Sequence, residues 1–592
     1  MDSMDQKLTY VTCFMTTYKE KEHQTTRNNA FYFARFCELA DSGIQICLYA
    51  DSEMSELIKR AGGCGSGANT RFPNVILMEL VKIEDTWAYS QYKNIPDIGI
   101  PNKRNEMKDT TNFMICMNSK IDFVADAARK NPFNSSHFAW IDFGVTHVFK
   151  ELDSCQHLLR FYGSARLAPR FLCIPGCLEK TSAENVDSFI ESVNWRFCGG
   201  FFIGDKTSID EFHSLHRAYF AVFLSLYKKI VWEVNFWAWL ESTVKAWKPI
   251  WVIADHNDTL IHIPAMLYSV SLKSMCGGGA YTKIKYDYLK INGFHPSSAS
   301  HYYCESSHRH FLNTRYVNYT INRDGYYEFD TVFNPENKII TRNVFSILDS
   351  ETLLPKCFHE VDEKDLGILP KSGGWIEGVE DIRIFKRNGS TTELQFIATS
   401  VNYSDCENNR IVLGKYVIDN ETGRVSLEDG QLLMRSEQDS CEKNWIPIGN
   451  EEQYIYGWSP FEIIGGNVNV SLSDKPPVDV FNSPICRKFR GSTVFLEIDN
   501  SKYLGIVHFT VGEGGNKYYL HCLVEIDKLT LLPIQYSQPF YFEKIQIEYC
   551  IGFYILKAER GGEEDKWCFW ISQMDKDPLL IVCEMPNKMF FF

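Results

Sequence analysis

The sequence predicts a chain of two parts with different architectures, an α/β unit followed by an all-β unit. Residues 8 to about 270 alternate short apolar runs with segments of helical periodicity. Later in the chain this periodicity disappears, and short runs of β-branched and aromatic residues recur about every 8–15 residues. The run Cys276-Gly-Gly-Gly-Ala280 separates the two textures, because consecutive glycines break regular elements. We therefore expect domains over residues 1–275 and 285–592, joined by a glycine-rich linker over residues 276–284.

Composition and charge narrow the class of protein. The 592 residues are 45% hydrophobic and 14% aromatic, with a net charge of -14. The acidic balance and the lack of a Lys/Arg cluster argue against a nucleic-acid partner and against an anionic membrane surface. A nucleotide-sugar remains compatible with this charge, since one metal ion can neutralise a diphosphate.

Targeting and redox features favour the cytoplasm. The first strand begins by Leu8, which leaves no room for a signal peptide, and no apolar run of about 18 residues occurs, so we expect no membrane span. The 19 cysteines are scattered without a C-x-x-C pair. This pattern is typical of reduced, mostly buried thiols.

The first part reads as strands and helices in alternation, as expected of a sheet covered by helices. The expected elements are a strand over Leu8–Phe14, a helix over Asn28–Leu39, a strand over Gly43–Ala50, a helical stretch from Asp109 through Lys130, a strand ending at Asp142, a strand over Arg196–Gly204, and helices over about Ser208–Lys229 and Trp232–Thr243.

The most informative stretch is His137-Phe-Ala-Trp-Ile-Asp-Phe-Gly144. An apolar run that ends in one carboxylate and a glycine is typical of a buried strand that ends at a site. Open α/β sheets bind ligands at the carboxyl ends of their strands, where Asp142 could hold a divalent cation. The alternative is an aspartate that caps the next turn.

Six ordered motifs carry a resemblance to a known family. Residues 8–270 resemble the HtrL/YibB-type putative glycosyltransferases, and the match keeps the order of the motifs. The motifs are Tyr10-Val-Thr, Asn112 through Asn118-Ser-Lys-Ile121, Trp140-Ile-Asp-Phe-Gly144, Gly199-Gly-Phe-Phe-Ile-Gly204, Trp232-Glu-Val-Asn235 and Asp255-His-Asn-Asp258.

The resemblance implies a GT-A-like fold, a UDP- or GDP-sugar donor, a glycan acceptor and a divalent metal, usually Mn²⁺ with Mg²⁺ as an alternative. Asp142 is the first expected metal ligand. His256 is the second, because GT-A enzymes commonly close the metal site with a C-terminal His, and His262 is a weaker substitute. The usual D-x-D motif has become Asp142-Phe-Gly144, which leaves a weaker metal site or metal independence open.

Further residues of these motifs are candidates for the same site. Glu233 could act as a general base on the acceptor hydroxyl, or simply favour the start of its helix. Gly199 and Gly200 could let the backbone approach a ligand, or form a plain bulge. The remaining candidates for donor or acceptor binding, with solvated surface residues as the alternative for the two cations, are Asn235, Lys120 and Arg27.

The second part shows weak repetition of units of roughly 55–60 residues, which favours a five-bladed β-propeller. A pair of β-sandwiches is the alternative. The units centre on His301–Ile321, Gly378–Tyr403, Asn444–Ile464, Gly491–Ile526 and Tyr541–Glu584.

A second resemblance covers about 300 residues of this part. They are similar to the propellers of β-mannoside phosphorylases (glycoside hydrolase family 130) and their mannosyltransferase relatives, which implies five blades with a sugar site in the central channel. The motifs are His295-Pro-Ser-Ser298, Asn313-Thr-Arg-Tyr-Val-Asn-Tyr319, Gly378-Val-Glu-Asp-Ile-Arg383, Glu442-Lys-Asn-Trp445, Arg490-Gly-Ser492, Val507-His-Phe509 and Tyr519-Leu-His521.

The acidic pair Glu380 and Asp381 lies next to Arg383, a combination suited to general acid work because neighbouring charges separate the pKa values of the two carboxyls. The alternative is a set of buried ion pairs that tie blades together. The relatives normally read Glu-Asp-Pro-Arg, and Ile382 replaces the proline here, which leaves open whether the propeller still does chemistry. Further candidates for sugar or phosphate binding are Arg315, Lys443, Arg490, His508 and His521.

Three functions therefore compete. The leading hypothesis is a glycosyltransferase whose propeller binds or processes the same glycan. The second makes the propeller the active part, as a mannoside phosphorylase or mannosyltransferase, with a degenerate first domain. The third is a non-enzymatic carbohydrate-binding protein.

Overall fold

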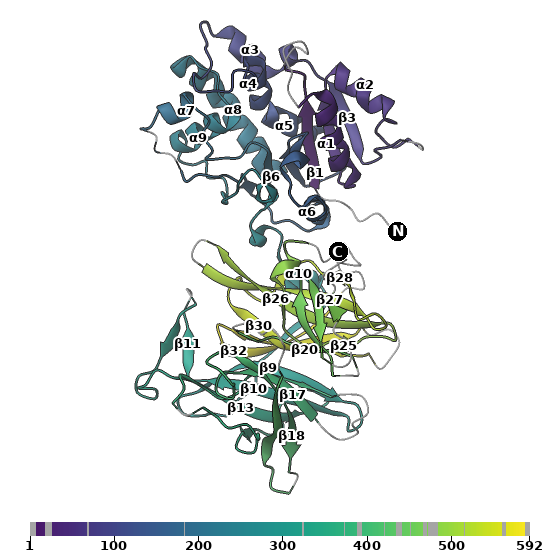
Figure 1. The fold of residues 1–592 in the computed structure, drawn as a ribbon, viewed down its shortest axis with the longest axis vertical. Coiled ribbons are helices and arrows are strands. Elements are labelled where there is room, and N and C mark those ends of the chain that lie inside the picture. The colour runs from purple at the N-terminus through teal and green to yellow at the C-terminus, as the bar shows by residue number, and fades with distance from the viewer. Residues whose placement is uncertain are drawn as a thin grey trace. The chain divides into compact units, whose positions relative to one another are not determined.

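Contacts within the chain divide it into two units, Met1–Tyr268 and Ser269–Phe592 (Figure 1). The structure, a computed structural model, describes residues 8–17, 27–67, 70–180, 182, 184–322, 325–371, 373–386, 394–419, 421–433, 441–449, 452–465, 470–471, 483–513, 516–558 and 564–585. The first unit is mixed α/β and the second consists mainly of β-sheet. Within the described residues no helix is long and apolar enough to cross a membrane.

The first unit holds one sheet and the helices around it. Its strands are β1 (Leu8–Phe14), β2 (Ile46–Ala50), β3 (Val75–Leu80), β4 (His137–Ile141), β5 (Leu172–Cys173) and β6 (Phe201–Asp205). Its helices are α1 (Asn29–Asp41), α2 (Ser52–Arg60), α3 (Trp87–Asn94), α4 (Thr111–Asn118), α5 (Lys120–Lys130), α6 (Leu152–Ser164), α7 (Asp187–Ile190), α8 (Lys206–Tyr227) and α9 (Glu233–Thr243).

The strand order is β3-β2-β1-β4-β6-β5. The pairs β3–β2, β2–β1 and β1–β4 are parallel, whereas β6 runs antiparallel to β4. Because β4 is central, both its neighbours satisfy its backbone, and every residue of the strand is buried. The end of β4 is therefore a rigid position from which to hold Asp142.

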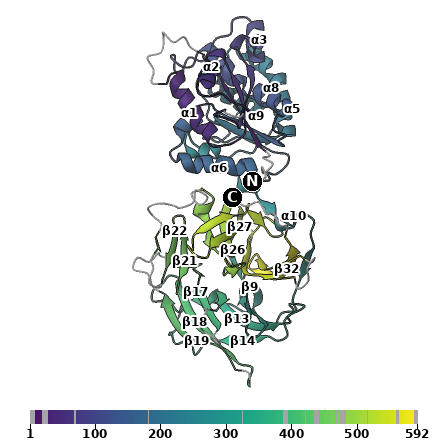
Figure 2. The same ribbon diagram turned by 90° about the vertical axis from the view of Figure 1, so that its right-hand side faces the viewer.

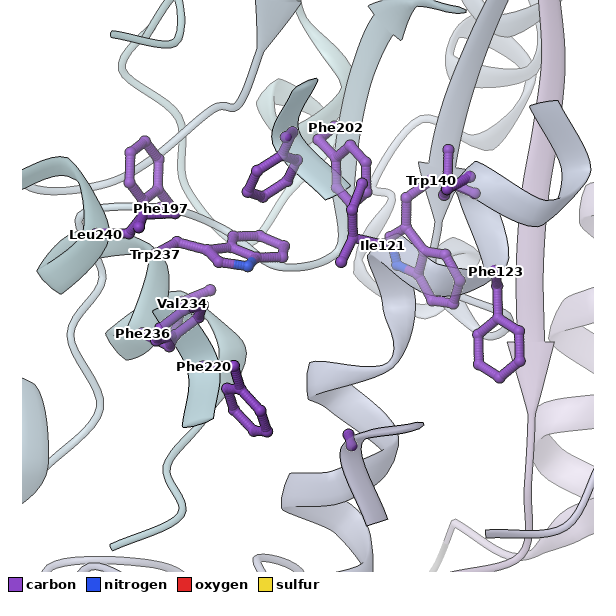
Figure 3. Packing of buried hydrophobic residues seen from close by; sticks show 14 of the residues in the cluster. Ile121, Phe123, Trp140, Phe197, Phe202, Phe220, Val234, Phe236, Trp237 and Leu240 are labelled. Carbon is purple, nitrogen blue, oxygen red and sulfur yellow. The ribbon is translucent and has the colours of Figure 1, made fainter. Parts of the chain in front are cut away.

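Both faces of β1 are covered, which explains its continuous apolar run. On one face Val11 belongs to the large cluster that also contains Trp140 of β4 and Ile121 of α5 (Figure 3). On the other face the hydroxyl of Tyr10 donates to the carbonyl oxygen of Leu159 in α6 at 2.7 Å. Figure 3 shows the cluster continuing to Trp237 of α9.

The helical stretch expected from Asp109 to Lys130 is two helices, α4 and α5, which meet at Ser119. The amide of Asn118 donates to the carbonyl oxygen of Val231 at 2.7 Å, and the hydroxyl of Ser119 donates to that of Ile115 at 2.9 Å. These buried side-chain bonds tie the junction to the segment before α9. The break makes Lys120 the first residue of a helix.

The strands of the second unit pair mainly antiparallel, and its described residues include the short α-helix α10 (Leu272–Met275). Its strands are β7 (Val270–Ser271), β8 (Tyr281–Ile284), β9 (His295–Cys304), β10 (Arg309–Val317), β11 (Tyr319–Ile321), β12 (Tyr327–Phe329), β13 (Ile339–Leu348), β14 (His359–Asp362), β15 (Ile376–Glu377), β16 (Glu380–Phe385), β17 (Leu394–Ser400), β18 (Arg410–Ile418), β19 (Val425–Leu433), β20 (Ile446–Pro447), β21 (Tyr454–Trp458), β22 (Phe461–Ile464), β23 (Val470–Ser471), β24 (Arg490–Gly491), β25 (Leu496–Glu497), β26 (Lys502–Glu513), β27 (Asn516–Asp527), β28 (Pro533–Tyr536), β29 (Phe540–Tyr541), β30 (Glu548–Leu556), β31 (Lys566–Gln573) and β32 (Lys576–Glu584).

The repeats centred on His301–Ile321 and Gly378–Tyr403, which we expected to form separate blades, share one sheet. It follows the path β16-β17-β18-β19-β14-β13-β10-β9, of which Figure 2 shows β17, β18 and β19 side by side. The link between its halves is a short parallel pairing of β14 with β19 at Val361 and Asp362. The ends of the path also approach each other, since the backbone N–H of Ile384 in β16 donates to the hydroxyl of Ser300 in β9 at 3.0 Å.

The segment expected as a linker, residues 276–284, belongs to the second unit. It contains β8, which pairs antiparallel with β32, the last strand described. The preceding strand, β7, pairs with β29. The glycine run is thus a turn between α10 and β8, and the division of the chain falls earlier, between Tyr268 and Ser269.

Candidate functional site

Asp142 follows β4 and is held from two sides. Its backbone N–H donates to the carbonyl oxygen of Gly200 at 2.9 Å, and the indole N–H of Trp140 donates to its Oδ1 at 2.7 Å. Although the strand before it is buried, the Asp142 side chain is 41% exposed. The carboxylate therefore reaches solution from a fixed base.

Lys120 lies at the centre of this site and is almost completely buried. Its Nζ lies 2.9 Å from Oδ1 of Asp142, 2.8 Å from Oε1 of Glu233 and 2.8 Å from the carbonyl oxygen of Gly199. Burial by itself lowers the pKa of a lysine, but the two carboxylates outweigh it and hold the pKa of Lys120 above its usual value. All three hydrogens have acceptors inside the protein, so Lys120 positions the two carboxylates and is not aimed at a ligand.

Glu233 is the buried partner of this pair, at the first position of α9. A Cβ at Gly199 would come within 1.9 Å of Oε1 of Glu233, so the glycine makes room for the carboxylate that binds Lys120. Glu233 is inside the protein with one oxygen already bound. This placement suits a residue that orders the site better than one that takes a proton from an acceptor.

Gly200 borders the outward side of Asp142. A Cβ there would lie 3.6 Å from Oδ2 of Asp142 and 2.9 Å from a side-chain carbon of Leu260. Since Oδ1 accepts from both Trp140 and Lys120, Oδ2 is the oxygen that could meet a cation. A single carboxylate oxygen fits a cation that arrives with its phosphates, as Mg²⁺ commonly does, and not a site made of protein ligands alone.

The charges of Arg27, Lys108 and Asp142 all act on His147, so two cations lie in the neighbourhood of Asp142. The pKa of His147 is lowered, chiefly by burial, and the charges of Arg27 and Lys108 add to that shift. Arg27 also opposes the rise that burial causes in the pKa of Tyr32. Arg27 itself is exposed. Positive charge beside a carboxylate is the arrangement expected around a diphosphate with its cation.

Asn235 has a structural role. It is fully buried, its Oδ1 accepts from the backbone N–H of Asn194 at 2.8 Å, and its Nδ2 donates to the carbonyl oxygens of Phe189 and Ser192. Its amide therefore ties α9 to the segment before β6.

The structure places His256, the second expected metal ligand, beside two cysteines. Among the described residues, the potential ligands that gather within 4.8 Å of one another as a group of three are Cys177, Cys198 and His256. No signal in the sequence linked these three residues, because α7 lies between the two cysteines, and β6, α8 and α9 lie between Cys198 and His256.

The second unit has a comparable centre at Arg315. Its guanidinium lies 2.8 Å from Oε1 of Glu380 and 3.0 Å from Oδ1 of Asp381, and it donates to the hydroxyl of Tyr319 at 3.3 Å. That hydroxyl donates to Oδ2 of Asp575 at 3.0 Å. Three carboxyls thus surround one buried cation.

The excess of acid changes the protonation of this centre. Burial raises the pKa of Glu380; Arg315 opposes the rise, and the charges of Asp381 and Asp575 add to it. Burial raises the pKa of Asp575 as well, again against Arg315 and with Asp381. Such a cluster retains a proton at a higher pH than an isolated carboxyl does, which is the property of a general acid.

Arg383 is buried beside this centre and holds strands together. It donates to the carbonyl oxygens of Ser492 at 2.6 Å and Asp381 at 3.1 Å, and to the hydroxyl of Tyr549 at 2.9 Å. The neighbouring Ile382 is fully buried.

The other predicted cations lie around His508. The pKa of His508 is lowered well below its usual value, first by burial and then by nearby positive charge. The cations that supply this charge are Arg383, Lys443 and Arg490, and protonation of His508 or of His521 would also oppose protonation of the other. His521 is fully buried, and burial lowers its pKa to about 3. Both histidines are therefore neutral, so the cationic part of this region is its Arg and Lys side chains.

Asp575 was missed in the sequence. It lies with Met574 in the turn between β31 and β32, where both residues have positive φ, 53° for Met574 and 52° for Asp575. Such a turn usually contains glycine or asparagine. A Met-Asp pair between two apolar strands was the only signal available.

The comparisons with known proteins support the first half in part. A family model described as "Bacterial protein of unknown function (HtrL_YibB)" matches residues 66–233, a range that includes Lys120, Asp142 and Glu233. The resemblance of the second half has no such support. No curated protein matches the chain. A solved chain named "glucose dehydrogenase" has 6% identity and a TM-score of 0.23, covering 52% of this chain and 100% of that chain, a likeness too slight to bear on fold or activity.

Proposed function

We propose that the first unit is a GT-A-like glycosyltransferase that moves a sugar from a UDP- or GDP-sugar to a glycan acceptor. In this reaction the bond from the sugar to the phosphate breaks, a bond to the acceptor oxygen forms, and a nucleoside diphosphate and a proton are released. The observation that carries the proposal is Asp142, exposed at the carboxyl end of a central strand and locked by Lys120 and Glu233.

In this proposal the donor diphosphate lies beside Asp142, with Arg27 and Lys108 close to its negative charge. A divalent cation, Mn²⁺ or Mg²⁺, would be held by Oδ2 of Asp142 and by the phosphates, and when bound it neutralises the leaving diphosphate. Lys120 keeps the Asp142 carboxylate oriented, and Glu233 keeps Lys120 in place.

Released nucleotide tests the proposal. The full chain is incubated with a panel of UDP- and GDP-sugars, with Mn²⁺ or with EDTA, beside the variants Asp142→Asn and Asp153→Asn. Asp153 is an exposed carboxylate at the start of α6 and serves as the matched control. We expect turnover of one donor that falls on the order of 100-fold in Asp142→Asn and is unchanged in Asp153→Asn. The melting temperature is measured with each donor as well. Turnover that survives in Asp142→Asn, or a melting temperature that no donor raises, contradicts the proposal.

For the second unit we propose that the antiparallel sheets form the five blades of a propeller, and that the centre at Arg315 binds or processes the same glycan. Polar residues from β10, β16 and the β31–β32 turn meet there, as the inner ends of blades would. The raised pKa values of Glu380 and Asp575 favour a catalytic role, as a mannoside phosphorylase or mannosyltransferase.

Phosphate-dependent cleavage of mannosides separates this second candidate from the first. We expect any such activity to be lost in Asp381→Asn and kept in Asp429→Asn. The two aspartates have the same φ of 51°, so the backbone tolerates an asparagine equally at both positions. Asp381 contacts Arg315, whereas Asp429 is exposed and pairs with Lys415. Glycan binding without either turnover would instead support a carbohydrate-binding protein.

The cytoplasm remains the proposed compartment. Every cysteine of the chain is a free thiol in the structure, which suits a reducing environment. A nucleotide-sugar and a glycan, and no nucleic acid, remain the proposed partners.

A further inference from the structure

We propose that Cys177, Cys198 and His256 form a binding site for a soft divalent cation, of which Zn²⁺ is the natural candidate, separate from the carboxylate site at Asp142. The Sγ atoms of the two cysteines are 3.5 Å apart, and all three potential ligand atoms lie within 4.8 Å of one another. Thiolate and imidazole together are the ligands that select zinc over the hard cations Mg²⁺ and Mn²⁺.

The spacing of the sulfurs suits a shared metal. Two thiolates bound tetrahedrally at about 2.3 Å from one zinc lie a little under 4 Å apart. A disulfide needs about 2.05 Å, so the pair would have to move closer to form one. Cys198 is buried and Cys177 half-buried, whereas His256 is exposed. The histidine side chain is thus the ligand that can swing to close the site.

The backbone around the three residues is tightly connected. The N–H of Cys177 donates to the carbonyl oxygen of Trp195 at 2.9 Å, and the N–H of Cys198 donates to that of Pro175 at 2.7 Å. On the other side the N–H of Ala254 donates to the carbonyl oxygen of Gly176 at 2.8 Å. The three ligand segments therefore lie in fixed register before any ion arrives, which lowers the entropic cost of binding.

Two packing features set this geometry. A Cβ at Gly176 would lie 1.8 Å from the carbonyl oxygen of Arg196, so only glycine lets the two cysteine segments approach. The ring of His256 packs edge-on against Trp195, with ring centroids 4.2 Å apart, which holds the imidazole on the side of the thiols.

The carboxylate of Asp255 acts on both thiols, and its negative charge favours a cation at this position. Zinc binds thiolates, so an ion held by both sulfurs displaces one proton from each cysteine, and zinc affinity should rise with pH.

The coordination is incomplete within the described residues, since the group contains three protein ligands. Zinc sites with three protein ligands keep a fourth position for water or substrate. Cys198 directly precedes Gly199, whose carbonyl oxygen accepts from Lys120. An ion at the thiols would thus fix the segment that shapes the carboxylate site.

Zinc and cobalt binding test the site in the full chain. The protein is reduced, stripped with a chelator and titrated with Zn²⁺ against a chromophoric chelator, and Co²⁺ is used to detect thiolate-to-metal charge-transfer absorption. The variants are Cys177→Ser, Cys198→Ser and His256→Asn. The controls are Cys37→Ser, a half-buried thiol elsewhere in the first unit, and His262→Asn.

We expect one Zn²⁺ per chain, and a thiolate charge-transfer band when Co²⁺ is bound instead. Either cysteine variant should lose more than about 100-fold in zinc affinity, which exceeds the cost of losing an outer-shell partner. The controls should bind as the unaltered protein does. Zinc should also protect Cys177 and Cys198 from alkylation, which needs no variant and remains valid where a serine variant fails to fold. No protection, or equal zinc binding in the cysteine variants and the controls, overturns the proposal.

Discussion

The two candidate sites each place one buried cation between two carboxylates, but they differ in how much acid surrounds it. In the first unit Lys120 binds Asp142 and Glu233, and one of these carboxylates is open to solution. In the second unit Arg315 binds Glu380 and Asp381 with Asp575 beside them. The first arrangement presents a fixed negative charge outward. The second raises the pKa values of Glu380 and Asp575, because burial and the neighbouring carboxyls disfavour their ionisation.

The difference bears on which unit does which chemistry. A fixed exposed carboxylate suits the binding of a cation and its phosphates, as a transferase requires. A carboxyl with a raised pKa suits proton donation to a leaving oxygen, as cleavage of a glycoside requires. The proposed transferase site and the proposed glycan-processing centre can therefore be tested separately.

Removal of the central cation should have the largest effect. We expect Lys120→Met and Arg315→Met each to cost about 3–5 kcal/mol of stability, because each leaves buried carboxylates without their partner. Local stability can be measured by hydrogen exchange of β4 and of β16 in increasing urea.

A second substitution in each site should then show different recoveries of stability in the two units. Adding Glu233→Gln to Lys120→Met should recover most of the lost stability, since the remaining carboxylate is exposed. Adding Glu380→Gln to Arg315→Met should recover less, since two carboxyls remain. Equal recovery in both units would contradict the proposed difference in acid content.

Acid should destabilise both units through fully buried histidines. Burial lowers the pKa of His216 to about 4 and that of His521 to about 3, both below the usual value near 6.5. The unfolded chain therefore binds a proton that the folded chain excludes. Each histidine contributes stability that is complete above pH 6.5 and is lost at about 1.4 kcal/mol per pH unit on acidification toward its folded pKa.

The matched variants are His216→Phe and His521→Phe, which keep an aromatic ring in each core. The unaltered chain loses stability between pH 6.5 and pH 5, and we expect each variant to reduce that loss by about 2 kcal/mol, in its own unit only. Hydrogen exchange of α8 and of β27 at the two pH values measures this. Variant and unaltered chains with parallel pH profiles would show that these histidines are not the acid-sensitive groups.

The smallest expected effect concerns the glycine beside Glu233. Gly199→Ala should cost about 1–3 kcal/mol, because the new Cβ would overlap the carboxylate that holds Lys120. The control is Gly163→Ala in α6, where a Cβ meets nothing within 4 Å, and we expect it to be neutral or stabilising by about 0.4–1 kcal/mol. Thermal unfolding compares the two. A Gly199→Ala chain as stable as the control would mean that Glu233 can move.

The elements that position Asp142 were predictable because their patterns are local. The run His137–Ile141 is one uninterrupted buried strand, and the strand at Leu8–Phe14 has the bounds expected from its apolar run. The break at Ser119 was not predicted. The residue before it, Asn118, hydrogen-bonds to distant Val231, a tertiary contact that no local pattern reveals.

The candidate sites also divide into residues that local motifs predicted and residues that only tertiary contacts reveal. Asp142 and Glu233 were recognisable from motifs, and the structure brings both to Lys120. Asn235 came from the same motif but is buried and fully bonded, since a motif does not distinguish residues that bind from residues that pack. The group at Cys177 arises only from tertiary contacts, as does the pairing of His256 with the two thiols.

The pairing of β8 with β32 has a consequence for how the chain is made. The first strand to enter this sheet, Tyr281–Ile284, hydrogen-bonds to the last one, Lys576–Glu584. During synthesis on the ribosome, β8 cannot pair until β32 has been made, which is after almost the whole unit has emerged. A nascent chain stopped short of β32 would expose that unpaired edge to chaperones and proteases, so quality control can recognise an incomplete copy by a single open strand.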